Sequence, residues 1–231
     1  MILVLALLGG GLWGAYWRVG RMVEERIEKE VAARLPSVIG VSGSYKVEAS
    51  AGLVGAARGR IESVRIEGRD VRLKSGVRLK RLDTTLKGIH VDPAKRTLTR
   101  IEEAQFTASL TGQELNAFLS RKYPDIPSHA ELHDGYVTVA ARPRARGGRV
   151  RVTSDASLEI ENGTRLVLRV RRIASGPVTA PDVAQRYIEQ KLNPVLDLSS
   201  LGFKGRLTSV TIRPDAVVLS GEGEPGALEK L

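Results

Sequence analysis

The residues best suited to chemistry are few, and the first group to weigh is a cluster of histidines and acids. His129 and His133 are four positions apart, with Glu131 between them and Asp134 following. On a helix this spacing would place both imidazoles on one face, within reach of a single metal ion. The segment from Glu131 to Ala141 alternates like a strand, in which positions four apart are about 13 Å from each other. We therefore expect strand-end histidines and no metal site.

Acid and base groups are no better arranged for catalysis. His90 lies beside Asp92, but no serine or other partner for a proton relay is in view. Glu102 and Glu103 are adjacent, so on a strand they are expected to point to opposite faces, which is the wrong arrangement for a pair of catalytic carboxylates. These groups therefore favour structural roles.

Motif searches give the same answer. Cysteine is absent, which excludes disulfides, thiolate nucleophiles and Cys-ligated zinc. The chain contains no G-x-S-x-G, no G-x-x-x-x-G-K-[ST] and no H-E-x-x-H. Gly9, Gly11 and Gly14 fit G-x-G-x-x-G, but no strand precedes them and no acidic residue follows at the spacing that dinucleotide binding requires. We predict a protein that is not an enzyme and needs no cofactor.

Arginine carries the clearest charge signal. Lys and Arg total 36 against 26 Asp and Glu, and nine Arg with three acids give residues 142–172 a net charge of +6 out of +10. An anionic surface is a natural partner for such a cluster, and a solvated face is the alternative. Nucleic acid is disfavoured because no aromatic residue interleaves with the arginines. The predicted contact residues are Arg142, Arg144, Arg146, Arg149 and Arg151.

The first 17 residues carry no charge and predict a membrane anchor. As a helix they would span roughly 26 Å, just short of a hydrocarbon core of about 30 Å. Trp13, Tyr16 and Trp17, followed by Arg18, are typical of a membrane interface. A cleaved signal peptide is the alternative, but no clear small-x-small cleavage site is found. We expect an uncleaved single-pass anchor with the following domain outside the cytoplasm, although the arginines after the segment favour the opposite orientation.

Hydrophobic periodicity predicts the elements that position these residues. Residues 18–36 have a helical apolar stripe and read as an amphipathic juxtamembrane helix ended by Pro36. A second helix begins at Thr111, where Glu114 completes a capping box, and closes at Pro124. A third covers residues 181–192, with proline in its first turn. Strands are predicted at 45–49, 59–67, 70–74, 77–91 and 101–110, in a block at 130–173, and at 205–213 and 216–220.

Strands in runs, with few helices between them, favour an antiparallel α+β fold. We predict a membrane helix at residues 1–17, the juxtamembrane helix at 18–36, a curved, mostly antiparallel β-sheet domain closed by two helices at 37–222, and a flexible tail at 223–231. One hairpin fixes a register: a three-residue loop at 161–163 would place Leu158 opposite Leu166 and leave one apolar and one charged face.

Several segments together resemble a known family. They are G-R-I-E-S-V-R-I at 59–66, G-I-H-V-D at 88–92, T-G-Q-E-L-N at 111–116, L-H-D-G-Y-V at 132–137, N-P-V-L-D-L at 193–198 and L-T-S-V-T-I-R-P-D at 207–215. With the apolar N-terminus, they are similar to the LmeA family of phospholipid-binding bacterial envelope proteins over roughly residues 20–222. The resemblance implies a fold like that of the tubular lipid-binding (TULIP) proteins, membrane lipids as partners, and no catalytic residues to transfer.

A sheet with one apolar face can enclose either a packed core or a slot for acyl chains, and the sequence is compatible with both. For a slot, the predicted lining is Val137, Val139, Val152, Leu158, Ile160, Leu166, Leu168 and Val170, with Leu115 and Phe118 as the lid. The function expected is binding or transfer of a phospholipid or another acyl-chain lipid. The alternative is a structural or adaptor module of the cell envelope that binds partners through its basic face.

Overall fold

The fold is that of a computed structural model. The structure describes residues 24–25, 28–29, 31–33, 35–36, 39–41, 43–51, 55, 59–73, 76–92, 97–124, 128–142, 144–145, 148–149, 152–175, 181–198 and 205–223. The predicted anchor and nearly all of the predicted tail lie outside these residues. Among the helices that are described, none has the length and apolar character needed to cross a membrane.

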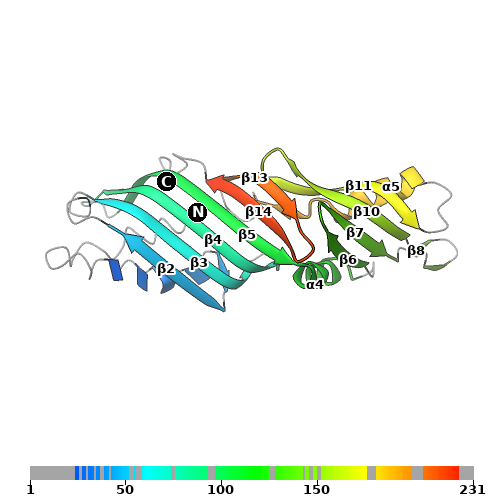
Figure 1. The fold of residues 1–231 in the computed structure, drawn as a ribbon, viewed down its shortest axis with the longest axis horizontal. Helices are drawn as coiled ribbons and strands as arrows, with labels where there is room; N and C mark the ends of the chain where they lie inside the picture. Colours follow the sequence, from blue (N-terminus) through cyan, green and yellow to red (C-terminus); the bar gives the residue numbers. More distant parts are fainter. Residues whose placement is uncertain are drawn as a thin grey trace.

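The larger sheet, sheet A, has seven strands built around three long antiparallel ones. Its order is β1 (Gly40–Val41), β3 (Arg60–Leu73), β4 (Arg78–Asp92), β5 (Thr97–Thr111), β14 (Ala216–Gly223) and β13 (Gly205–Ile212), with β2 (Ser44–Ser50) also paired to β3. Strands of 14 or 15 residues extend about 46–50 Å. They give the molecule its elongated shape (Figure 1).

The sequence divided β3 into two strands, and that division is wrong. Asp70 adopts a left-handed φ of 53° without ending the strand. Arg69 still pairs with Arg81 and Val71 with Leu79, so one register with β4 continues past Asp70. Aspartate tolerates this conformation better than most residues, which is why a turn-like residue could be kept inside a long strand.

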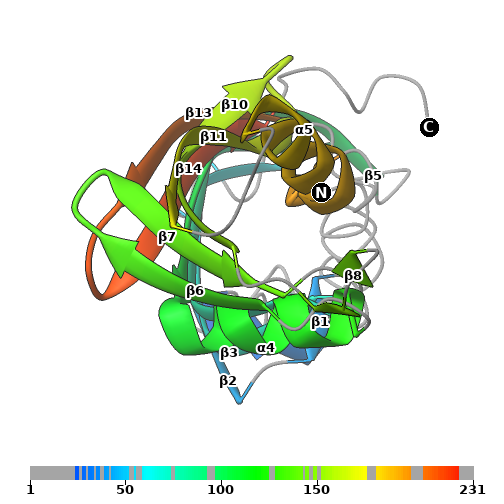
Figure 2. The same cartoon turned by 90° about the vertical axis from the view of Figure 1, so that its right-hand side faces the viewer.

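The smaller sheet, sheet B, has five strands in the order β12 (Leu196–Asp197), β11 (Arg165–Ser175), β10 (Val152–Glu161), β7 (Tyr136–Ala141) and β6 (Ser128–His133). A two-stranded ribbon, β8 (Arg144–Ala145) and β9 (Gly148–Arg149), is inserted between β7 and β10. Helix α4 (Gly112–Lys122) leads from sheet A into β6, and α5 (Pro181–Leu192) follows β11. Figure 2, along the long axis, shows sheet B and the two helices arranged in a ring. The strand-rich antiparallel α+β class is confirmed.

The predicted hairpin register is wrong, although the predicted apolar face is right. Leu158 pairs with Leu168 and Ile160 with Leu166, because the loop comprises residues 162–164 instead of 161–163. Asn162 and Gly163 both have positive φ, and Thr164 donates its N–H to the carbonyl of Glu161. The shift is two residues in pairing, so the same side chains still face the interior.

The two helices predicted after residue 110 are confirmed. The side chain of Thr111 accepts from the Glu114 N–H, and Glu114 accepts from the Thr111 N–H, which completes the predicted capping box of α4. Leu115, Phe118 and Leu119 form its buried face. Helix α5 has its predicted bounds. These two helices therefore present apolar faces to sheet B and to the end of sheet A.

The two sheets and the helices form an elongated tube, and its apolar interior has two parts along the long axis. One core cluster joins α4, α5, sheet B and the adjoining ends of β4, β5, β13 and β14. The other lies under helical residues of the segment 24–36 and includes Val31 and Leu35, which are at most 1% exposed. Ile39 and Tyr45 pack against both clusters. The tube therefore has a continuous apolar interior from the N-terminal helical segment to α5.

Turns of sheet B form hydrogen bonds with the edge of sheet A at β13. The Leu207 N–H donates to the Gly163 carbonyl at 2.6 Å, and the Gly135 N–H donates to the Ile212 carbonyl at 3.1 Å. Backbone groups that would otherwise leave an open sheet edge are thereby paired. These two hydrogen bonds therefore join the turns of sheet B to the edge strand of sheet A.

Candidate functional site

An apolar cavity lies where the end of sheet A, sheet B and the two helices meet. All of its lining side chains are hydrocarbon, so it offers no acid, base or metal ligand to an occupant. The lining comprises Val77, Leu79 and Leu110 from sheet A and its β3–β4 turn, Leu115, Phe118 and Leu119 from α4, Ala130, Val137, Val139, Leu158, Leu166 and Leu168 from sheet B, Leu192, Val195 and Leu196 from α5 to β12, and Val217 and Leu219 from β14.

The cavity has a volume of about 50 Å³. One water molecule needs about 10–15 Å³ on the same measure, so the space would admit a few waters or a short stretch of hydrocarbon. Empty cavities of this apolar character stay dry and accept apolar guests. The cavity is therefore chemically suited to an acyl chain but must widen to hold most of one.

Seven of the ten apolar residues predicted from the sequence line this cavity. They are Val137, Val139, Leu158, Leu166, Leu168, Leu115 and Phe118. Val152 and Val170 are buried in the same core cluster without reaching the cavity, and Ile160 is partly buried against that cluster. Whether any of these residues contacts lipid stays a prediction.

Sequence reasoning missed the contribution of sheet A and of the segment after α5. Val217 and Leu219 alternate along β14, a pattern that predicts burial but not which space the side chains border. Val195 and Leu196 belong to the N-P-V-L-D-L segment, whose apolar residues could have been included. Only the tertiary pairing of the two sheets brings these residues to the cavity.

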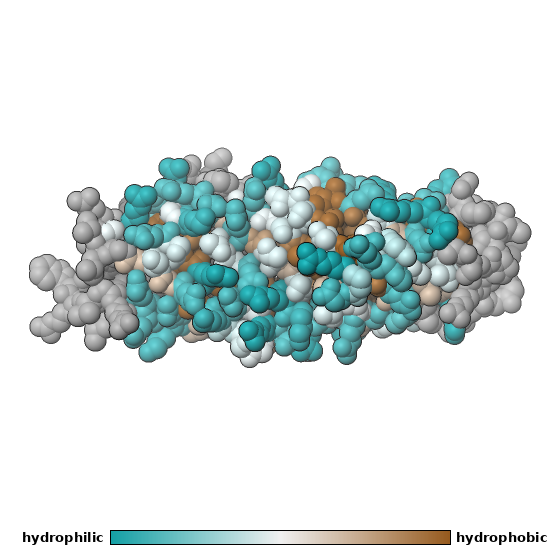
Figure 3. Space-filling model, in the orientation of Figure 1, coloured by the Kyte–Doolittle hydropathy of each residue, from teal (hydrophilic) through white to brown (hydrophobic). Residues whose placement is uncertain are grey.

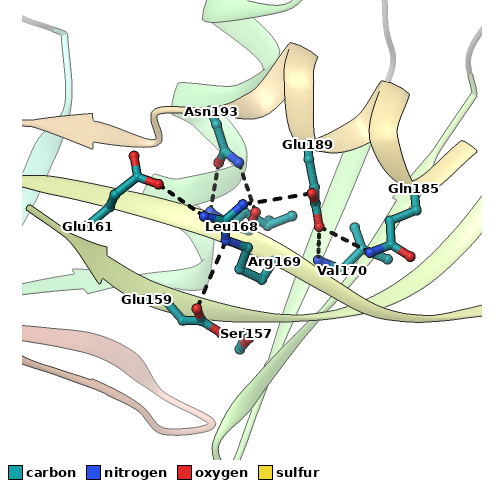
Figure 4. A network of polar contacts seen from close by, with 9 residues as sticks. All are labelled: Ser157, Glu159, Glu161, Leu168, Arg169, Val170, Gln185, Glu189 and Asn193. Atoms are coloured by element: carbon teal, nitrogen blue, oxygen red, sulfur yellow. Dashed lines mark hydrogen bonds and ion pairs between the residues drawn. The ribbon is translucent and has the colours of Figure 1, made fainter. Parts of the chain in front are cut away.

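Side chains of α5 and of the residue that follows it bind the edge of β11 beyond Leu166, where its pairing with β12 ends (Figure 4). The Asn193 amide forms two bonds with Leu168, accepting from its N–H at 2.7 Å and donating to its carbonyl at 2.9 Å. Glu189 accepts from the Val170 N–H at 2.9 Å. Helix side chains thus occupy the place of a neighbouring strand and hold Leu192 against the cavity.

Side-chain hydrogen bonds to strand backbones also hold α4 and the N-terminal helical segment in place. The Asn116 amide pairs with both backbone groups of Ala130 on β6, at 2.8 and 2.7 Å. Glu24 accepts from the Ala51 N–H and Glu28 from the Ala49 N–H, each at 3.1 Å. Three strand edges are therefore closed by carboxamide or carboxylate groups from helical segments or their ends.

The outer surface is mostly hydrophilic in the view of Figure 3, with hydrophobic side chains visible where the two sheets meet. Of the predicted surface-contact residues, Arg142 is exposed, Arg144 and Arg149 pair through their backbones in β8 and β9, and Arg146 and Arg151 lie outside the described residues. Their contact with an anionic surface stays a prediction.

Arginines of β11 pair with carboxylates, though not in the predicted register. Arg169 binds Glu161 at 3.0 Å, and Arg172 binds Asp155 at 2.7 Å. The hydrogen bond from Arg172, with a further one from Thr138, holds the pKa of Asp155 below its usual value despite partial burial. Arg165, Arg169 and Arg172 of this strand therefore contact carboxylates, and two of these acids, Asp155 and Glu161, are already counted in the net charge of +6 for residues 142–172.

The remaining titratable residues form pairs on the surface. His129 and His133 lie on β6 as predicted, and no group of three potential metal ligands occurs in the described portion of the chain. His90 contacts Glu102 at 3.0 Å, and this hydrogen bond lowers the pKa of Glu102. Glu103 binds Lys87. The side chains of Glu102 and Glu103 are 43% and 41% exposed, and that they face opposite sides of the sheet stays a prediction.

Comparison with known proteins gives one match. A family model described as LmeA-like phospholipid-binding matches residues 18–222. No curated protein and no solved structure matches the chain.

Proposed function

The chain belongs to the LmeA-like phospholipid-binding family, and from this premise we propose that it binds a membrane phospholipid by an acyl chain in the apolar cavity. The observation that carries the proposal is a cavity lined by hydrocarbon side chains from both sheets and both helices. Burial of hydrocarbon would supply the affinity, at about 0.8 kcal/mol for each methylene removed from water. Nothing in this lining favours one acyl chain over another of similar width.

Filling the cavity provides the test. Val139 lines it and is 2% exposed, so Val139→Phe places a ring in the space that the acyl chain would enter. The full chain should be expressed and purified in a lipid-free detergent, and its bound phospholipid extracted and quantified by mass spectrometry. We expect the variant to retain at most about a third of the wild-type phospholipid per protein, because added bulk in a small cavity opposes a guest.

Val152→Phe is the matched control. Val152 is 5% exposed and lies in the same core cluster on the neighbouring strand, but it does not line the cavity. Equal loss of lipid in both variants would assign the effect to general packing. Absence of phospholipid from the wild type, with no uptake of a fluorescent phospholipid, would refute lipid binding and favour the adaptor module. The segment 24–36 must be retained, because Glu28 accepts from the Ala49 N–H of β2 and Glu24 from the Ala51 N–H just after this strand.

Membrane attachment, lipid transfer and an extracytoplasmic location are further parts of the proposal. The uncharged segment at residues 1–17 and the arginines that begin at Arg142 support membrane attachment, whereas the charges that flank the segment do not support the extracytoplasmic location. A tether beside a lipid surface would keep a lipid-binding domain at the source of its ligand. Fractionation, with protease treatment of intact cells and of spheroplasts, tests this part: a soluble chain, or one protected in spheroplasts, would overturn it.

A further inference from the structure

If the cavity holds an acyl chain, as the proposed function states, the charged headgroup of the same phospholipid must lie close by. The cavity has no polar side chain in its lining, and a phosphodiester cannot be buried in such surroundings without a partner. The headgroup must therefore remain at the rim, next to side chains that can donate to an anion. Cations that contact residues next to the lining identify a part of the rim that meets this requirement.

Two adjacent cations, Arg121 and Lys122, meet this requirement at the end of α4. Both are exposed and occupy the last turn of the helix whose Phe118 lines the cavity. Lys122 follows Phe118 by four positions, and its Nζ lies 5.3 Å from the centre of that ring. The ammonium group is thus one side chain away from the interior.

The partners of these cations place them on two sides of the cavity. Lys122 Nζ donates to the Pro194 carbonyl at 3.1 Å, and Arg121 Nη2 donates to the Gly76 carbonyl at 2.7 Å. Gly76 immediately precedes Val77, and Pro194 immediately precedes Val195; both valines line the cavity. The two cations therefore contact two segments that carry lining residues, the β3–β4 turn and the segment after α5.

In the part of the chain described, both cations contact neutral groups only, namely backbone carbonyls and, for Lys122, aromatic rings. Elsewhere on the surface, cations such as Arg81 and Arg172 contact carboxylates at 2.6 and 2.7 Å. No ion pair with a described carboxylate involves Arg121 or Lys122, so a phosphate would replace weaker, uncharged acceptors. Cations also complement the negative end of a helix, but that role does not require them to reach carbonyls on two other segments.

We propose that Arg121 and Lys122 form a phosphate-binding site at the rim, which takes the phosphodiester of the phospholipid whose acyl chain occupies the cavity. The guanidinium can bind two phosphate oxygens at once, and the ammonium supplies a second positive charge on the neighbouring segment. This site selects phospholipids over uncharged lipids with the same acyl chains.

The test compares two fluorescent lipids with the same labelled acyl chains, phosphatidylglycerol and diacylglycerol, presented to the full chain in neutral detergent. The variant is Arg121→Gln/Lys122→Gln. We expect its affinity for phosphatidylglycerol to fall about tenfold, as for loss of exposed charge-assisted bonds, with affinity for diacylglycerol unchanged within about twofold. Lys87→Gln/Arg206→Gln is the control, since it removes the same charge from residues paired with Glu103 and Glu222.

Each other outcome has a definite reading. Equal losses for both lipids, or no loss for either, would overturn the phosphate site while leaving acyl-chain binding intact. A wild-type chain that binds neither lipid would overturn the proposed function and this site with it. If glycerol phosphate alone displaced labelled phosphatidylglycerol at equal concentration, the site would be one for a free phosphate ester instead of a lipid headgroup.

Discussion

Asn193→Ala tests the idea that helix side chains stand in for a missing strand. The Asn193 side-chain amide is the hydrogen-bonding partner of both backbone groups of Leu168, and Leu168 is only 5% exposed. Alanine removes both partners at once. Because little water reaches this position, the Leu168 N–H and carbonyl would lose their bonds without full compensation by solvent.

The expected cost follows from these two bonds. A typical protein hydrogen bond contributes about 1 kcal/mol net, and a buried group left without a partner costs about 1–3 kcal/mol. Two groups at one site therefore predict a loss of about 2–4 kcal/mol in the free energy of unfolding. For a domain of this size, that loss lowers the Tm by roughly 4–16 °C.

Urea unfolding followed by far-UV circular dichroism measures this loss. Tryptophan fluorescence is unsuitable, because the two tryptophans are Trp13 and Trp17, outside the described fold. The control is Gln190→Ala, an exposed position on α5, where a change within about 0.5 kcal/mol is expected. If Asn193→Ala were no less stable than this control, the amide would not be holding α5 to β11, and the reasoning applied to Asn116 would fail as well.

Two further predictions concern the N-terminal half of the tube. Burial raises the pKa of Tyr45 to about 12, above an unfolded value of about 10, so the stability that its protonated form provides below pH 10 is lost as the pH rises towards 12. Between about pH 10 and 12, urea unfolding should therefore show a smaller loss of stability for Tyr45→Phe than for the wild type. An identical dependence of the free energy of unfolding on pH in the two proteins would contradict this assignment. The double variant Glu24→Ala/Glu28→Ala should speed hydrogen exchange at the Ala49 and Ala51 amides, because both amides lose their acceptors. Glu25→Ala, at an exposed position, should leave this exchange unchanged. Unchanged exchange in the double variant would show that the two carboxylates do not protect these amides.

Local signals predicted the elements that depend on local physics. The bounds of α5 and the capping box between Thr111 and Glu114 need only neighbours in sequence, and both were predicted correctly. The β10–β11 hairpin marks the limit of such reasoning. Its apolar face followed from alternation, but its register depended on Thr164 joining the loop, which alternation does not detect because a shift of two residues in pairing preserves the face.

Tertiary features were beyond the sequence for a different reason. Nothing local distinguishes Asn116 or Asn193 from an ordinary polar residue, because their partners Ala130 and Leu168 are brought to them by sheet pairing. The set of residues that lines the cavity also depends on how the strands pair. Its predicted residues came from one sheet and one helix, whereas Val217 reaches it from a strand that pairs with β5.

The pattern of fastening also indicates how the cavity would widen. Asn116 holds α4 to β6 by two bonds of 2.7 and 2.8 Å, and Asn193 holds the end of α5 to β11 by two of 2.7 and 2.9 Å. Between the ends of the two helices, the described bonds are longer: Lys122 to the Pro194 carbonyl at 3.1 Å and Tyr123 to the Leu192 carbonyl at 3.4 Å. Among the described hydrogen bonds, separation there would break only these two and would leave both sheet edges bonded to Asn116 and Asn193. It also frees Lys122, so under the proposed function the movement that admits an acyl chain releases the cation that binds the phosphate.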